Sequence, residues 1–312
     1  MIRIKQKLAD TYHDFPTPLQ KGKYLFIFCM IIVPVVGFAI FYVTTNINSI
    51  LLAFQRFTGY DEEGHEQYQW GFYQFKTAYE SMTSDDGVLL LALKNTLIFF
   101  LTTSLLLPVN FIVSYFLYKK VAGEKVFTVL FFLPHIVSSL VMVSMFKNII
   151  SVNGIVAEII GTWGMKMPKL LTQDETAMKT ILAYCIWLGI PGNMILLRGA
   201  MSRVSTELID ASRIDGCGNW GEMKNVILPG TFGTVSTLFV LSLGGIFTAS
   251  GPILLFTNGN YKTMTIDFYI FNEVKNRASY ELPSAVGLIF TAVALPITLI
   301  SRKVADQLYT ED

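Results

Sequence analysis

Six long apolar segments, separated by polar stretches, organise the chain. They cover about 24–45, 95–117, 126–146, 180–197, 231–251 and 284–301, and none of them contains Asp, Glu, Lys or Arg. Each has roughly the 17–25 residues that a helix needs to cross the hydrocarbon core of a membrane. The pattern therefore predicts an all-α, polytopic membrane protein with about six transmembrane helices.

Composition narrows the class further. Of the 312 residues, 52% are hydrophobic and only 15% are charged, whereas charged residues make up about 25% of soluble domains. The net charge of +1 gives no support for a nucleic-acid partner. The three cysteines lie far apart and form no CxxC pair, which argues against a disulfide framework or a thiolate metal site. We expect no catalytic, cofactor-binding or metal-binding residues in this chain.

Lysine and arginine predict the orientation. Segments 1–23, 118–125, 198–230 and 302–312 hold 14 of the 24 basic residues, at roughly twice the density of the remaining loops. The denser side is the cytoplasmic one by the positive-inside rule, which places both termini inside. We therefore expect a cytoplasmic segment 1–23, a membrane domain 24–303 and a cytoplasmic tail 304–312, in the cell membrane.

The apolar segments are interrupted in a way that suits a gated pathway. Prolines stand within five of them, and a sixth proline ends the fifth segment: Pro34, Pro108, Pro134, Pro191, Pro296 and Pro252. A proline frees a backbone carbonyl and bends a membrane helix, which is tolerated where neighbours or a water-filled cavity satisfy the backbone. Ordinary helix packing explains these prolines equally well.

The chain carries no evident energy source for transport. The only ionisable residue within the spans is His135, beside Pro134, where a hydrogen-bonded packing role fits better than a proton relay. The GxxxxGK[ST] loop of P-loop ATPases is absent from the sequence. If transport is active, its energy must come from another subunit, and the sequence should show where that subunit attaches.

The longest cytoplasmic loop, 205–229, is the candidate for this attachment. Ser205 or Thr206 can cap a helix, and Glu207 and Asp210 in its first turn suit the helix dipole. Gly216 fits the left-handed position that ends such a helix.

A second short helix should follow the glycine. Asn219 and Glu222 have the spacing of a capping pair, and Pro229 should break the chain before the fifth span. In the first helix, Leu208, Ala211 and Ser212 share one face, and Ile209 lies near it. An apolar face in the cytoplasm needs a partner or the membrane surface to cover it.

These residues resemble a known motif. Asp210-Ala211-Ser212-Arg213-Ile214-Asp215-Gly216-Cys217, followed by Ile227-Leu228-Pro229, resembles the EAA loop of binding-protein-dependent ABC importer permeases, approximately E-A-A-x-x-D-G-A and then I-x-L-P. Three positions depart from the pattern: Asp210, Ser212 and Cys217. The resemblance implies a type I ABC importer permease whose loop inserts its first helix into a groove of a nucleotide-binding subunit. The residues assigned to this coupling loop are Glu207, Leu208, Asp210, Ala211, Ser212, Asp215, Gly216 and Pro229.

The resemblance extends over about 20–303. Phe131-Phe132-Leu133-Pro134, Trp187-Leu188-Gly189 and Thr257-Asn258-Gly259-Asn260 are similar to the maltose, glycerol-phosphate and multiple-sugar branch. This branch implies import of a carbohydrate, such as an oligosaccharide or related polyol. It also implies three partners: a second homologous permease, an ATPase dimer, and an external solute-binding protein or lipoprotein.

The resemblance supplies no residue-by-residue motif for the solute pathway. Aromatic and neutral polar side chains within the spans suit sugars, which have apolar ring faces and hydroxyl edges. The candidates are Asn110, Tyr115, Ser138, Tyr184, Trp187, Asn193 and Thr248. Each of them could instead serve helix packing.

Several alternatives stay open at this point. The external segment 55–86 is rich in aromatic and acidic residues, which fits either a surface for the solute-binding protein or interfacial anchoring. The solute could belong to another class, such as glycerol-phosphate, a polyamine or a peptide. A membrane-embedded transferase is a remote alternative, since no DxxxD or HxxxH pair stands at the membrane face.

Overall fold

The computed structural model describes residues 18–84, 87–277 and 279–310. Residues 1–17 of the predicted N-terminal segment and the last two residues of the tail lie outside the described residues. The chain begins with a rod made of α2 (Pro18–Gly37), the π-helix η1 (Phe38–Val43) and α3 (Thr44–Ala53). After the rod come β1 (Gln55–Tyr60), β2 (Glu66–Trp70) and α4 (Tyr73–Thr83).

The rest of the described chain is helical. The middle contains α5 (Val88–Ser104), α6 (Leu106–Tyr118), α7 (Glu124–Ile136), α8 (Ser139–Ile149), α9 (Ile155–Gly161), α10 (Ala177–Gly189) and α11 (Met194–Met201). It continues with α12 (Thr206–Ile214), α13 (Asn219–Glu222), the π-helix η2 (Met223–Ile227) and α14 (Leu228–Gly244). The chain ends with α15 (Ile253–Phe256), α16 (Ile266–Arg277) and α17 (Glu281–Thr310).

The helices match the predicted spans. Within the described residues, five helical stretches are long and apolar enough to cross a membrane: Gly22–Ala53, Val88–Tyr118, Ala177–Met201, Asn219–Gly244 and Glu281–Gln307. Each overlaps one predicted segment. Pro108 lies in the first turn of α6 and Pro191 in the turn between α10 and α11, so both prolines mark places where a spanning stretch changes helix.

The third predicted segment is not one continuous helix. Its two halves, α7 and α8, are bent by 108° at a short break. Pro134 removes one hydrogen bond from the end of α7, and the backbone of Val137 and Ser138 is extended. Ser138 then takes the N-cap position of α8, a position that serine favours.

The sequence also missed a small β-hairpin. Strands β1 and β2 pair antiparallel, with Gln55 opposite Trp70 and Tyr60 opposite Glu66. The Asp61 carboxylate accepts the backbone N–H groups of Glu63 and His65 and so closes the turn. The protein is therefore all-α apart from this hairpin.

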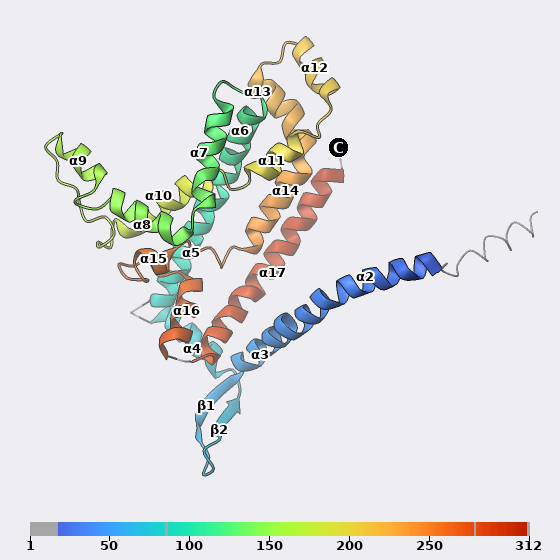
Figure 1. Ribbon diagram of the computed structural model, residues 1–312. Coiled ribbons are helices and arrows are strands. Elements are labelled where there is room, and N and C mark those ends of the chain that lie inside the picture. Colours follow the sequence, from blue (N-terminus) through green and yellow to red (C-terminus); the bar gives the residue numbers. More distant parts are fainter. Residues whose placement is uncertain (1–17, 85–86, 278, 311–312) are drawn as a thin grey trace, which may run out of the picture.

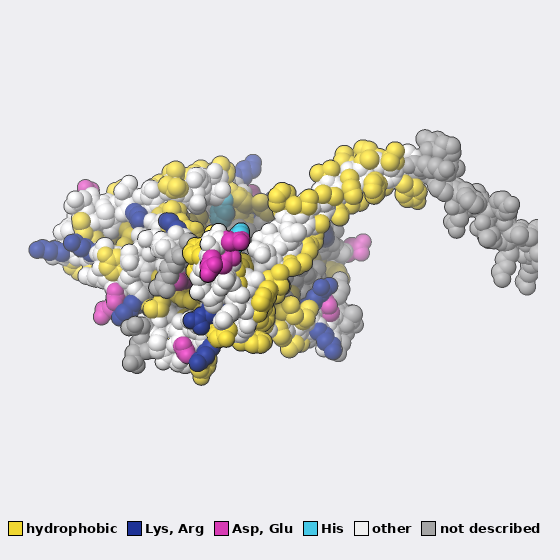
Figure 2. All heavy atoms as spheres, turned by 90° about the horizontal axis from the view of Figure 1, so that it is seen from below, with side chains coloured by type: hydrophobic (Ala, Val, Ile, Leu, Met, Phe, Trp, Pro, Cys, Tyr) yellow, Lys and Arg dark blue, Asp and Glu magenta, His cyan; other side chains and the backbone are white. Residues whose placement is uncertain are grey.

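The bundle has two ends (Figure 1). The loop end carries α12 and α13, and the described C-terminal end of α17 lies near it; the hairpin end carries β1, β2 and α4. The α2 part of the rod leaves the body at an angle. Seen from the hairpin end, apolar side chains run along this rod outside the body (Figure 2), and no residue in its most apolar 18-residue window is buried.

A buried cluster beneath the loop end positions the site. It contains Phe111 and Tyr115 from α6, Leu197 and Met201 from α11, Val204, Ile209 from α12 and Ile227 from η2. Residues from four helical elements thus meet in one apolar core, which fixes α12 against the membrane helices.

Candidate functional site

The first helix of the loop begins as predicted. Ser205 is the N-cap of α12, and its hydroxyl oxygen accepts the backbone N–H of Glu207 at 3.2 Å. Of the two possible caps, the structure therefore selects Ser205 and places Thr206 in the first turn. Glu207 lies beside the exposed N–H groups of that turn, where its charge is favourable.

The glycine turn also agrees with the prediction. Gly216 has a φ of +81°, in the left-handed region. The N–H of Cys217 donates to the carbonyl of Ser212 at 2.9 Å, and the N–H of Gly216 donates to that of Arg213 at 3.1 Å. These two bonds are those of a Schellman motif, which satisfies the last carbonyls of α12 and reverses the chain after Asp215.

The inner face of α12 differs from the predicted one. Ile209 and Ser212 are buried against the membrane helices, and the Ser212 hydroxyl donates to the carbonyl of Ile209 at 2.8 Å. Leu208 and Ala211 are exposed, so they do not share the buried face with Ser212. The helix itself was predicted correctly, but the sequence of the loop alone does not show which side of the helix faces the protein core.

The outer face of α12, defined here as Leu208, Ala211 and Ile214, is therefore exposed. Leu208 is 60% exposed and Ile214 is 86% exposed. Asp210 also points outward and forms an exposed ion pair with Arg213 at 3.1 Å. This outer face lies at the tip of the loop end (Figure 1).

The predicted capping pair of the second helix is wrong. Gly218, not Asn219, is the N-cap of α13, and it makes no side-chain capping bond. Glu222 turns instead into the protein, where only 2% of its side chain is exposed. A carboxylate in this position must find charged or hydrogen-bonding partners, because burying it unpaired is costly.

Glu222 is the centre of a network from three helices. The Lys119 amine, at the end of α6, donates to both carboxylate oxygens at 2.9 and 2.8 Å. Arg213, from α12, donates through Nε at 3.1 Å. The Tyr115 hydroxyl lies 3.3 Å from the carboxylate and donates to the carbonyl of Asn219 at 2.8 Å. With Asp210 on Arg213, the network holds two positive and two negative charges.

Pro229 does not break the chain before the fifth span. The helix continues from Asn219 to Gly244, and Pro229 lies in the first turn of α14 directly after the π-helix η2. A proline is tolerated there because the wider π turn changes the hydrogen-bonding pattern that its missing N–H would otherwise disrupt.

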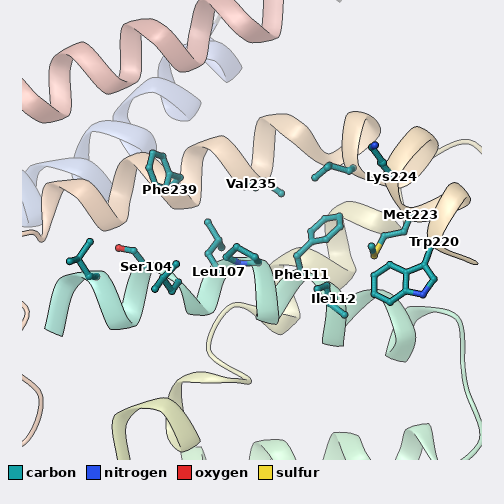
Figure 3. A pocket seen from close by; sticks show the side chains of 13 residues that line it. Ser104, Leu107, Phe111, Ile112, Trp220, Met223, Lys224, Val235 and Phe239 are labelled. Carbon is teal, nitrogen blue, oxygen red and sulfur yellow. The ribbon is translucent and has the colours of Figure 1, made fainter. Parts of the chain in front are cut away.

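A cavity of about 640 Å³ lies between α5–α6 and the helices that follow the loop. Its lining is apolar except for Ser104 and Lys224. Phe111 and Ile112 from α6 meet Trp220 and Met223 at its loop end (Figure 3). Outside the Glu222 network, the contact between the loop and α6 therefore leaves an apolar gap.

The structure separates the predicted pathway residues into two groups. Tyr115 and Asn110 are buried, with 0% and 3% exposure. Tyr115 supports the loop, as described above. With its amide nitrogen turned toward α10, Asn110 donates to the carbonyls of Gly189 and Ile190 at 3.2 and 2.6 Å, so it ties α6 to α10. Both residues take part in helix packing in this structure, and their place in the solute pathway stays a prediction.

The remaining candidates lie at helix ends or in an aromatic cluster. Ser138 and Asn193 are the N-caps of α8 and α11, and Thr248 is exposed after α14. Tyr184 packs edge-on against Phe146, whose ring is stacked on Trp187 with centroids 6.2 Å apart. Trp187 is 41% exposed, so of the aromatic candidates it alone offers a ring face to a ligand.

Comparison with known proteins finds membrane components of transport systems. Residues 112–309 match the family model described as binding-protein-dependent transport system inner membrane component. The chain is 24% identical over 222 residues to the polygalacturonan/rhamnogalacturonan transport system permease protein YteP of Bacillus subtilis (strain 168), covering 69% of each chain. It is 24% identical over 226 residues to the multiple sugar-binding transport system permease protein MsmF of Streptococcus mutans, covering 70% of this chain and 77% of that one.

A solved structure shares the fold. It is a chain of a bacterial alginate ABC transporter in complex with an alginate pentasaccharide-bound periplasmic protein, with a TM-score of 0.76 and 21% identity. The match covers 94% of this chain and 98% of that one. The family match spans well over half of the chain and agrees with its membrane helices. The chain therefore belongs to the family of inner membrane components of binding-protein-dependent transport systems and is a multi-pass protein of the cytoplasmic membrane.

Proposed function

We propose that this chain is one permease subunit of an ATP-driven importer and that the outer face of α12 docks a separate ATPase subunit. The observation that carries the proposal is the exposure of Leu208 and Ile214 on a helix whose opposite face is buried in the membrane domain. Large apolar side chains on a well-packed helix call for a partner. The loop end is then cytoplasmic, in agreement with the density of basic residues.

ATP and Mg²⁺ are bound by that partner and not by this chain. The ATPase moves α12 when its two copies close around ATP, and the membrane helices follow because α12 is packed against α6 and α11. Support comes from the EAA-like loop, from the Schellman turn that sets the angle between α12 and α13, and from the transport-system family.

A second permease subunit completes the pathway. The rod Gly22–Ala53 is long enough to span the membrane, yet the part that leaves the body makes no buried contact within the described chain. Its apolar surface fits a helix that leans on a neighbouring subunit and on lipid. We propose a homologous permease as that neighbour, and an external solute-binding protein at the hairpin end.

The proposed solute is a carbohydrate. YteP is named for the transport of polygalacturonan and rhamnogalacturonan, and MsmF for that of multiple sugars. The alginate transporter was solved with an alginate pentasaccharide-bound periplasmic protein. In this chain the exposed ring of Trp187, stacked on Phe146, supplies the apolar platform that a sugar ring can cover. Replacing Trp187 by Ala should weaken uptake more than replacing it by Phe.

The test begins with purification of the tagged chain from membranes of its own host. The expected result is co-purification of an ATP-hydrolysing subunit and a second permease. Uptake of maltotriose, trigalacturonate, a dipeptide and glycerol 3-phosphate into vesicles that contain the complex then compares the solute classes. Recovery of the chain without an ATPase would contradict the proposal, and uptake of the dipeptide or glycerol 3-phosphate alone would contradict the sugar assignment.

A further inference from the structure

We infer that Glu222 is a positioning residue, which transfers the movement of α12 directly to α6. The inference rests on the proposed function, since it assumes that an ATPase moves α12. It concerns a different question, namely which contact carries that movement into the membrane helices.

The covalent route from α12 into α14 contains two compliant points. The first is the turn Gly216-Cys217-Gly218, where two glycines restrict the backbone least. The second is the π-helix η2, which interrupts the regular hydrogen-bond ladder between α13 and α14. A displacement of α12 would be partly absorbed at both points before it reached α14.

The ion pairs of Glu222 span the first compliant point and bypass the second. Its ion pair with Arg213 at 3.1 Å spans the glycine turn and joins the last turn of α12 to α13. Its ion pair with Lys119 at 2.8 Å joins α13 to the end of α6 ahead of the π-helix. The carboxylate therefore connects the docking helix to a membrane helix that lies 103 residues earlier in the sequence than Glu222.

Apolar packing alone would hold these helices less specifically. Ile209 packs in the cluster beneath the loop, but apolar attraction has no preferred direction and tolerates sliding. The Lys119 amine contacts both oxygens of Glu222, and charge-assisted bonds fix both distance and direction. With only 18% of Lys119 exposed, solvent weakens this pair less than it would a surface pair.

The chain offers a matched control. Arg198 in α11 and Glu124 in α7 form a second partly buried ion pair at 2.8 Å. This pair joins two membrane helices near the loop end without contacting α12 or α13. Loss of this ion pair should lower the stability of the protein but should not change the stimulation of ATP hydrolysis by the external solute-binding protein.

The experiment uses the whole transporter purified from its host, with its ATPase and its solute-binding protein. ATP hydrolysis is measured in vesicles with and without the binding protein, and the ratio of the two rates reports coupling across the membrane. We expect Glu222→Gln to lower this stimulation about tenfold, within the range of couplings between distant sites, with the ATPase still bound. Glu124→Gln should leave the ratio unchanged.

A second pair of variants guards against misfolding. Lys119→Met should lose stimulation like Glu222→Gln, whereas Lys119→Arg keeps the charge and the donors and should retain it. A wild-type ratio for Glu222→Gln or for Lys119→Met would overturn the inference, as would equal loss in Lys119→Arg and Lys119→Met. Absence of an ATPase or of any stimulation in the wild-type complex would instead contradict the proposed function on which the inference depends.

Discussion

The two ends of the helix bundle hold their charged side chains in different ways. At the loop end, Glu222 is almost fully buried and ties three helices together through Lys119 and Arg213. At the hairpin end, ion pairs such as Lys76 with Glu80 are solvated, with 78% and 62% of their side chains exposed. Burial makes the charge of Glu222 part of the packing between helices, whereas Lys76 and Glu80 remain available to solvent and to other molecules.

The difference shows which ion pairs can hold helices together. A buried, bonded carboxylate holds fixed distances between helices, while an exposed pair on one helix holds nothing beyond its own turn. This contrast supports the proposal that the loop end moves together with its neighbouring helices. Variants at the two ends should show this contrast in stability and in coupling.

The largest effect on stability should come from Glu222→Ala. This change leaves the Lys119 amine largely buried without its counter-charge, at a cost of about 3 kcal/mol. Denaturant unfolding of the purified chain in detergent micelles measures the difference. A loss below that of an exposed ion pair would show that the network does not hold the loop end together.

The second-largest effect on stability should come from Gly216→Val. A β-branched residue in the left-handed region costs about 1–2 kcal/mol and redirects the chain between α12 and α13. We expect solute uptake to be abolished while the protein still inserts into the membrane. Gly216→Asn is the control, because asparagine tolerates this backbone conformation; normal uptake by the valine variant would undermine the coupling role of the turn.

Leu208→Asp should change binding and not folding. Leu208 is exposed, so stability should stay within about 0.5 kcal/mol of the wild type. Recovery of the ATPase in co-purification should fall by about tenfold, as expected when a charge enters an apolar interface. Tyr79→Asp on α4 at the hairpin end is a matched exposed control and should not affect ATPase recovery.

The smallest effect should come from Glu80→Ala on the exposed face of α4. An exposed pair four residues apart on a helix contributes only about 0.3–0.5 kcal/mol. The same unfolding assay as for Glu222→Ala gives the comparison directly. A loss as large as that of Glu222→Ala would remove the contrast between the two ends.

Much of the fold could be predicted from the sequence, because the strongest signals are local. Charge-free apolar stretches mark the spans, Ser205 marks the start of α12, and Gly216 marks its end. These features depend on a few neighbouring residues and on the properties of lipid. Pro134 marked an interruption of the third segment, but the size of the bend, 108°, could not be predicted because it depends on the neighbours of α8. The hairpin at Gln55–Trp70 was missed, since it depends on pairing between two short polar strands.

The least predictable part was the interior of the site. Glu222 looked like a helix-capping residue because its spacing from Asn219 is right, and its true partner Lys119 lies far away in the sequence. Tyr115 was assigned to the solute pathway, since a span boundary does not reveal which end of a helix faces a loop. The available signal for the network was an acidic residue in the loop that precedes the fifth span, together with the lysines that follow α6.

The docking of an ATPase on α12 can be tested most directly with a photo-crosslinking amino acid at position 208, in cells that contain the complete transporter. Irradiation should join this chain to an ATP-binding protein, and the same group at position 79 on the hairpin end should not. Identification of the adduct by mass spectrometry decides the question. Adducts with lipid alone, or with a protein that does not bind ATP, would contradict the account.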